Sequence, residues 1–163
     1  MIRVGLGYDV HPFAADDDGR PLVLGGVTID GRGLVGHSDA DAVCHAVADA
    51  LLGPAGLPDL GAQFPASDET YRDASSLALL RDVVERVAAA GWSVVNVDVV
   101  VNAEAPRLAP HLDAMTAAVR DALGGAHVSI TPKRGEGIGA VGRGEGVQCW
   151  VVALLESDGS PRD

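Results

Sequence analysis

The segment WSVVNVDVVV, residues 92–101, most directly decides the fold of this 163-residue chain. Four valines recur at every second position from Val95 to Val101, so they share one face of a predicted β-strand. Helical periodicity precedes this strand over 74–90 and follows it over 110–123, and a glycine comes after each helical segment. A strand between two amphipathic helices predicts an α/β protein.

A further helix is expected nearer the N-terminus, over 39–52, where apolar residues recur at four-residue spacing. Ser38 with Asp41 three positions later is a capping-box pattern, which predicts that Ser38 caps this helix. The dipeptide Gly53-Pro54 predicts its end. Other expected elements are strands over 2–10, 128–131 and 147–155, a hairpin over 22–29, a loop over 56–73 and a glycine-dense loop before residue 147.

Strands and helices alternate without a linker or a repeat, which predicts one α/β (α+β) sandwich domain over 1–156. The helices are expected on one face of the sheet, and an exposed valine-rich opposite face would indicate an oligomer interface. Residues 157–163 are expected to form a disordered tail.

Composition and charge exclude several classes of protein. The chain carries 12 basic and 23 acidic side chains, and its formal charge of −11 argues against a general nucleic-acid binder. Cys44 and Cys149 are too few for a disulfide scaffold or a cysteine-rich zinc site. No stretch approaches the roughly 18–20 apolar residues of a membrane span, and residues 1–4 show no secretory-signal pattern. A cytoplasmic location is therefore expected, with the plastid stroma as the alternative in a eukaryote.

Asp9, His11 and His45 are the candidate metal ligands. Residues two apart on a strand point to the same side, so Asp9 and His11 present a carboxylate and an imidazole together. His45 would supply a third ligand from the helix, and two imidazoles with one carboxylate suit a tetrahedral Zn²⁺ that keeps one position open. The alternative is that each histidine is an ordinary polar residue near the surface.

Two further segments are candidates for ligand binding. The start of the helix at His37 and Ser38 offers free N–H groups to an anion, although Ser38 alternatively serves only as a cap. Asp59-Leu60-Gly61 in the long loop is either a substrate contact or a solvated turn.

Read in order, the motifs of this chain resemble the 2-C-methyl-D-erythritol 2,4-cyclodiphosphate synthase family of the non-mevalonate isoprenoid pathway. The resemblance extends over nearly the whole chain, from the first strand to the last. The matching stretches are GLGYDVHPF (5–13), LGGV (24–27), GHSDAD (36–41), HAVADALLG (45–53), LG (60–61) with FP (64–65), NVD (96–98), APR (105–107) and GRGEG (142–146).

The resemblance implies a mostly four-stranded mixed sheet, a homotrimer and active sites between neighbouring subunits. It also implies the reaction of a metal-dependent, cyclising phosphorus–oxygen lyase. The 2-phosphate of 4-diphosphocytidyl-2-C-methyl-D-erythritol 2-phosphate attacks the β-phosphorus, CMP leaves and a cyclic diphosphate forms.

Individual roles also follow from the resemblance. Zinc on Asp9, His11 and His45 would hold the β-phosphate, and a Mg²⁺ or Mn²⁺ ligated by Glu136 would bridge the α- and β-phosphates. Asp49 would support the metal site from behind or accept an N–H or water hydrogen bond. The resemblance also implies that His37 and Ser38 contact the phosphate and erythritol part, and that Asp59 and Gly61 contact the hydroxyls. The residues implied around cytosine are Ala103, Ala105, Pro106, Arg107 and Leu108. Arg143 and Glu145 would form either a structural ion pair or the mouth of a central cavity for isoprenoid diphosphates.

The chain departs from the family pattern before Glu136. Lys133 and Arg134 stand where consecutive threonines are usual, so a hydroxyl for the α-phosphate is replaced by cations that could hold phosphates by charge. Arg107 stands where the family has a lysine, and this exchange of one cation for another is a milder departure than that at Lys133 and Arg134. The departure favours, as the alternative to the synthase, a catalytically weak paralogue that binds cytidine nucleotides or isoprenoid diphosphates. A zinc-dependent phosphohydrolase is the third hypothesis.

Overall fold

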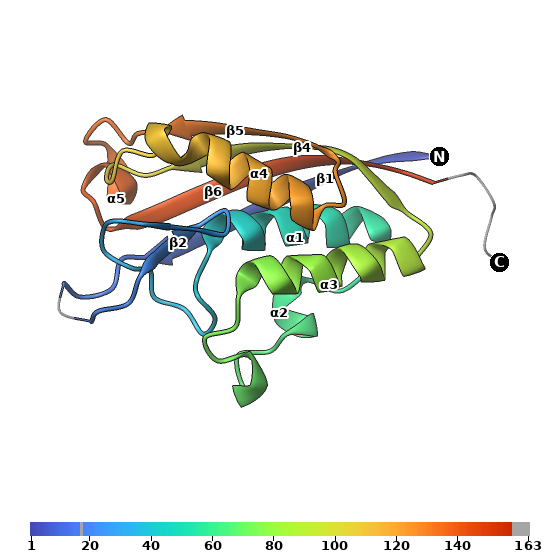
Figure 1. The fold of residues 1–163 in the computed structure, drawn as a ribbon, viewed down its shortest axis with the longest axis horizontal. Helices are drawn as coiled ribbons and strands as arrows, with labels where there is room; N and C mark the ends of the chain where they lie inside the picture. The colour runs from blue at the N-terminus through green and yellow to red at the C-terminus, as the bar shows by residue number, and fades with distance from the viewer. Residues whose placement is uncertain (17, 158–163) are drawn as a thin grey trace.

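The structure, a computed structural model, describes residues 1–16 and 18–157 and is built on a four-stranded sheet in the order β1-β6-β4-β5 (Figure 1). β1 and β4 both run antiparallel to β6, whereas β4 and β5 are parallel, so the sheet is mixed as predicted. A short hairpin of β2 and β3 lies apart from it. The strands are β1 Ile2–Pro12, β2 Leu22–Leu24, β3 Val27–Ile29, β4 Ser93–Asn102, β5 His127–Lys133 and β6 Gly146–Glu156.

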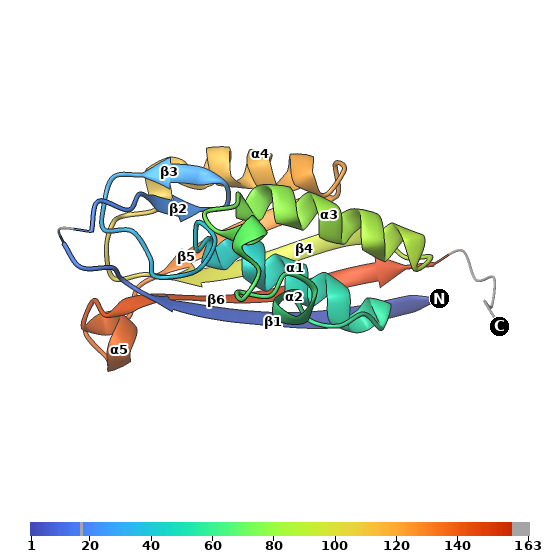
Figure 2. The same cartoon turned by 90° about the horizontal axis from the view of Figure 1, so that it is seen from below.

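The three long helices cover one face of this sheet and leave the other face open (Figure 2), which confirms the predicted arrangement. No helix within the described ranges 1–16 and 18–157 has the length and hydropathy to cross a membrane. The helices are α1 Ala42–Ala55, α2 Leu60–Gln63, α3 Ser76–Ala89, α4 Leu112–Ala122 and α5 Gly139–Gly142, with 3-10 turns at Glu69–Tyr71 and Ala109–His111.

The sequence predicts that the four alternating valines of residues 92–101 share one face of the strand, and three of the four do so. Val97, Val99 and Val101 are fully buried beneath the helices. Val95 is only half-buried, because the pairing of β4 with β6 is irregular between Val94 and Asn96. Such a bulge inserts one residue into the strand, so the side chains before and after it no longer follow one alternation. Strict alternation in the sequence does not reveal a bulge.

The open face of the sheet is apolar. Leu6 is 71 % exposed and Val4 66 %, and Tyr8 stacks at a tilt on Trp150 with ring centroids 5.6 Å apart. Val152 extends the same exposed row on β6. The sequence left open what covers this face, and its exposed apolar residues, Val4 and Val152 among them, are the feature that would indicate an oligomer interface.

The predicted cap of α1 is wrong. Asp41, not Ser38, is the N-cap, and its carboxylate accepts hydrogen bonds from the Val43 and Cys44 N–H groups. The same carboxylate accepts the N–H groups of Gly25 and Gly26 at 2.9 and 2.6 Å. Asp41 thereby joins the hairpin to the start of α1, and the Ser38 hydroxyl is left for other partners.

The predicted end of α1 is also wrong, by three residues. The helix continues through Gly53 and Pro54 to Ala55, and it ends at Gly56 in the left-handed conformation. Proline is tolerated in the last turn because it interrupts only the bond to Ala50. The Pro54 carbonyl accepts a 2.7 Å hydrogen bond from the Arg3 guanidinium.

The segment over 56–73, predicted as a loop, contains α2 and one 3-10 turn. Side chains nucleate both: Asp59 caps α2 by accepting from Ala62 N, and Asp68 accepts from Thr70 N. Other elements differ only at their ends, and α5 adds one helical turn inside the glycine-dense loop. The expected tail lies outside the described residues except for Ser157.

Two glycines let β1 and α1 pack backbone to backbone. A Cβ on Gly7 would lie 1.9 Å from the Ala46 carbonyl oxygen, and one on Gly5 equally close to the Ala50 carbonyl oxygen. Gly5 and Gly7 are buried on the face of β1 that also carries the half-buried Asp9. The close packing therefore places a face of α1 directly over the polar end of β1.

Candidate functional site

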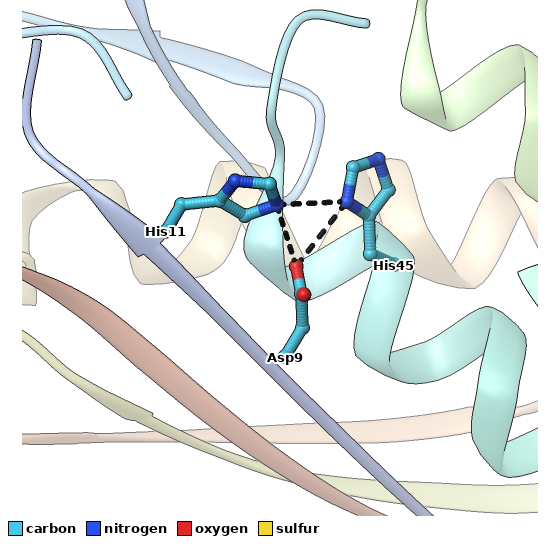
Figure 3. Close-up of side chains that lie close together, drawn as sticks. All are labelled: Asp9, His11 and His45. Atoms are coloured by element: carbon cyan, nitrogen blue, oxygen red, sulfur yellow. Dashed lines mark hydrogen bonds and ion pairs between the residues drawn. The ribbon is translucent and has the colours of Figure 1, made fainter. Parts of the chain in front are cut away.

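Asp9, His11 and His45 converge at the junction of β1 and α1 (Figure 3). The Asp9 Oδ2 lies 2.9 Å from His11 Nε2 and 3.2 Å from His45 Nδ1, and the two ring nitrogens are 3.2 Å apart. The three side chains are 15–22 % exposed. The sequence prediction that these residues form one group is confirmed.

The triangle of donor atoms has the size of one face of a metal tetrahedron. Ligand atoms about 2.0–2.1 Å from a tetrahedral ion are separated by about 3.3 Å, close to the observed spacings. Two imidazoles and a carboxylate are also the donor set of several catalytic zinc sites. The residues present therefore fit a metal ion with an open fourth position.

The ring nitrogens that face away from the cluster make hydrogen bonds, and these orient the imidazoles for cation binding. His11 Nδ1 lies 2.7 Å from the Val35 carbonyl oxygen, so Nδ1 carries the proton and Nε2 presents its lone pair to the cluster. The second ring nitrogen of His45 also points away from the cluster (Figure 3). It lies 2.8 Å from Ser76 Oγ and 3.1 Å from Ser38 Oγ.

The electrostatics of the cluster favour a positive charge. Burial alone would raise the pKa of Asp9, but hydrogen bonds with His11 and His45 bring that pKa well below its ordinary value. Burial alone would lower the pKa of His11, but the adjacent Asp9 carboxylate and the Val35 carbonyl together outweigh it and raise that pKa. An anionic carboxylate thus lies beside two imidazole nitrogens, and together these groups attract a cation.

The cluster opens into a hollow of about 250 Å³, here called the metal hollow. Asp49 lies on its wall and accepts a 2.8 Å hydrogen bond from Leu60 N, so it ties α1 to α2. That bond is the N–H alternative predicted for Asp49. Asp59 caps α2 and is not part of the wall. The wall consists of Asp9, His11, His37, Ser38, His45, Asp49, Leu60, Gly61, Phe64, Ala66, Tyr71 and Leu79.

A second hollow, of about 580 Å³, lies where β4 and β5 end; we call it the β4–β5 hollow. Arg134 reaches across its rim, with Nη2 2.8 Å from Glu104 Oε1. The wall contains all the residues expected around cytosine and both cations of the unusual segment. They are Ala103, Glu104, Ala105, Pro106, Arg107, Leu108, Ala109, Pro132, Lys133 and Arg134.

Besides Asp59, two more predicted site residues lie outside these two hollows. Arg143 lines a third hollow of about 470 Å³, and its Nε is 2.6 Å from Glu145 Oε1, so the expected ion pair forms. Glu136 is exposed, with a positive φ of 52°, and lines none of the three hollows. Within residues 1–16 and 18–157, Asp9, His11 and His45 form the one group with metal-ligand spacing.

One chain does not bring the metal hollow and the β4–β5 hollow together. β1 and β5 are the two edges of the sheet, and Val10, Gln148, Asn102 and Lys133 lie at one level across it. Three inter-strand steps separate these edges by about 14 Å. Residues predicted for one substrate therefore lie at opposite edges of the sheet.

Ser76 is the site residue that sequence reasoning missed. It is 1 % exposed and its hydroxyl touches His45, yet in the sequence the pair Ser75-Ser76 looks like an ordinary helix start. Tyr71, which also lines the metal hollow, lies in a segment predicted as a loop. Only their position in space reveals these contacts.

The fold and the site define a class of single-domain α/β proteins in which three potential metal ligands face a hollow. The chain belongs to the YgbB family, which matches residues 2–156. It is 54 % identical over 156 residues to the 2-C-methyl-D-erythritol 2,4-cyclodiphosphate synthase of Bordetella petrii, covering 94 % of each chain.

Solved structures share the architecture. The bifunctional IspDF of Campylobacter jejuni superposes with a TM-score of 0.90 at 34 % identity; the match covers 96 % of this chain and 42 % of that one. The IspF–CDP complex of Plasmodium falciparum gives a TM-score of 0.83 at 28 % identity and 96 % coverage of both chains. The fold class expected from the sequence is confirmed.

Proposed function

We propose that this protein converts 4-diphosphocytidyl-2-C-methyl-D-erythritol 2-phosphate into 2-C-methyl-D-erythritol 2,4-cyclodiphosphate and CMP. The 2-phosphate oxygen forms a bond to the β-phosphorus while the α–β phosphoanhydride bond breaks, so CMP leaves with the electron pair. The observation that carries the proposal is the Asp9, His11 and His45 cluster in a chain 54 % identical to a synthase of this name. The catalytic unit is residues 1–156.

The residues of the metal hollow would bind the reacting phosphates and the erythritol part. Asp9, His11 and His45 would hold Zn²⁺, which supplies Lewis-acid polarisation of a phosphate oxygen when bound. Ser38 presents a hydroxyl and His37 an imidazole to the same hollow. Because the nucleophile and the leaving group belong to one substrate, the protein's task is to hold a ring-closing conformation.

The β4–β5 hollow would receive the cytidine end. Its volume of about 580 Å³ is ample for a nucleoside, and backbone groups of 103–108 would read the base. A solved relative carries CDP in its name, which supports a cytidine ligand for this hollow. Lys133 and Arg134 on the wall supply positive charge for the diphosphate. Glu136 would be the one protein ligand of a Mg²⁺ or Mn²⁺ that the substrate phosphates otherwise hold.

The separation of the two hollows supports a homotrimer in which each active site combines the metal hollow of one copy with the β4–β5 hollow of its neighbour. The open apolar face provides a surface for that assembly. Light scattering is expected to give three times the chain mass of 16.6 kDa. Leu6→Arg, which places a charge at a highly exposed apolar position of this face, is expected to lower the mass to that of one chain and abolish turnover. A wild-type monomer with full activity would refute the shared site.

The activity is tested by incubating pure protein with the diphosphocytidyl substrate, Zn²⁺ and Mg²⁺. Equal amounts of CMP and cyclic diphosphate are expected, measured by anion-exchange chromatography and ³¹P NMR. A linear diphosphate product would instead indicate a phosphohydrolase. Absence of CMP in protein that has bound Zn²⁺ would reject the synthase.

Arg134 distinguishes the synthase from the non-catalytic paralogue. Arg134→Ala is expected to lower kcat/KM by about 10- to 100-fold, because a charge-assisted hydrogen bond to phosphate contributes about 1.5–3 kcal/mol. Arg81→Ala removes another exposed arginine, from an ion pair between α3 and α4, and should leave kcat/KM unchanged. The paralogue hypothesis predicts the reverse pattern, with wild-type turnover near zero and an increase in Arg134→Thr.

A further inference from the structure

A chain of hydrogen bonds leads from His45 into the protein on the side away from the metal cluster. His45 Nε2 lies 2.8 Å from the Oγ of Ser76, the first residue of α3. The Ser76 hydroxyl is hydrogen-bonded to Asp39 Oδ1, and the Ser76 N–H donates to Asp39 Oδ2 at 3.0 Å. Asp39 therefore accepts both hydrogens that Ser76 offers.

The chemistry of these groups assigns every proton in the chain. An ionised carboxylate only accepts, so the Ser76 hydroxyl donates its hydrogen to Asp39. The Ser76 oxygen can then only accept from His45, which places the ring proton on Nε2. His45 Nδ1 keeps its lone pair, and this is the atom that faces Asp9 and His11.

Ser38 does not replace Ser76 in this role. The Ser38 Oγ is farther from His45 Nε2, at 3.1 Å. It accepts a hydrogen bond from the Ala40 N–H, whereas the Ser76 hydroxyl donates to a carboxylate. Its hydrogen is free to turn between Ser76 and the metal hollow. The hydroxyl of Ser38 can thus serve a substrate without disturbing the orientation of His45.

The backbone holds the two ends of the relay in place. Asp39 N donates to the Ala74 carbonyl at 3.1 Å, and Asp73 N donates to the His37 carbonyl at 2.9 Å. The segment before α1 is therefore tied to the segment before α3. Ser76 is fully enclosed there, with an exposed fraction of 1 %.

We propose that Asp39 and Ser76 are positioning residues that fix the ring orientation and the metal-binding tautomer of His45. The inference rests on the metal centre of the proposed function. The ring orientation and tautomer of His11 are fixed by a backbone carbonyl, which side-chain substitution leaves in place. Those of His45 depend on two side chains. Partners behind ligating histidines commonly change metal affinity by about 10- to 100-fold.

The experiment measures Zn²⁺ affinity by competition with a chromogenic chelator, independently of turnover. Ser76→Ala is expected to weaken Zn²⁺ binding by about 10- to 100-fold. Ser75→Ala is the matched control, because it removes a neighbouring exposed hydroxyl that caps α3 and does not contact His45; its Zn²⁺ affinity should equal that of the wild type. Thermal unfolding of each metal-free variant shows whether the fold is retained.

Asp39→Asn tests the proton assignment. In either orientation of the amide its NH₂ group opposes one of the two hydrogens of Ser76. When it faces the hydroxyl, Ser76 loses its acceptor on residue 39 and can donate instead to His45 Nε2, 2.8 Å away, which transfers the ring proton to Nδ1 and blocks the ligand atom. Zinc affinity should fall although the side-chain volume is preserved.

Nitrogen-15 NMR of the Zn²⁺-loaded protein provides a direct spectroscopic readout. The His45 Nε2–H proton should give a slowly exchanging resonance in the wild type and exchange rapidly in Ser76→Ala. Wild-type Zn²⁺ affinity and unchanged exchange in Ser76→Ala would overturn the proposal, as would a loss in Ser38→Ala alone. Absence of CMP release by a wild type with intact Zn²⁺ affinity would instead count against the proposed function.

Discussion

Asp9→Ala is expected to abolish CMP release and metal retention together. Removal of the carboxylate leaves two neutral imidazoles, so both a ligand and the negative charge that attracts the cation are lost. The loss of Zn²⁺ affinity should exceed the roughly 10- to 100-fold typical for groups behind a ligand. Metal content after gel filtration and chelator competition measure the binding, and CMP release measures the activity.

The matched control is Asp113→Ala, which removes an exposed carboxylate in the first turn of α4 and changes the net charge equally. Its Zn²⁺ affinity and turnover should equal those of the wild type. Asp9→Ala should retain a cooperative unfolding transition, because the apolar core does not include this side chain. Turnover by Asp9→Ala at the wild-type rate would refute the metal centre.

The sequence predicts the sheet well because its strands obey local rules. Alternating valines placed β4, and glycine or proline separated most elements. The departures arise where a residue of β4 leaves the ladder, as at Val95, or where short helices are nucleated by aspartate caps. Period and composition carry no information about a bulge, since it depends on the partner strand.

The metal cluster was only partly accessible to local reasoning. Asp9 and His11 share a face of any strand, but the periodicity of α1 does not indicate which of its polar residues meets that strand. Ten of its 14 residues are buried, so no single apolar stripe identifies the inward face. His45 was a candidate third ligand by residue type alone, and the family resemblance made that choice specific.

The misassigned cap shows why local rules fail near a site. Ser38 and Asp41 are both good N-cap residues, and the structure selects Asp41 because Gly25 and Gly26 donate to the same carboxylate. That contribution comes from a hairpin some 15 residues away and is invisible in the helix sequence. The selection leaves the Ser38 hydroxyl next to His45 instead of at the helix end.

Gly7→Ala is expected to destabilise the protein and weaken its metal site, although Gly7 touches neither ligand nor substrate. The new methyl would lie 1.9 Å from the Ala46 carbonyl oxygen, so β1 and α1 must separate. Overpacking of this kind costs about 1–3 kcal/mol and sometimes more. Since Asp9 and His11 lie on β1 and His45 on α1, the separation also spreads the ligand triangle.

Urea unfolding and chelator competition measure the two effects of Gly7→Ala, and both should be found in the same variant. A shift of about 1 Å in a site can reduce its activity by roughly 100-fold, so turnover should fall further than stability alone explains. Gly53→Ala adds the same methyl to α1 where no atom lies within 4 Å. It should raise stability by about 0.5–1 kcal/mol and leave Zn²⁺ affinity unchanged. If Gly7→Ala kept wild-type stability and Zn²⁺ affinity, the direct packing of strand on helix would not be what assembles the three ligands.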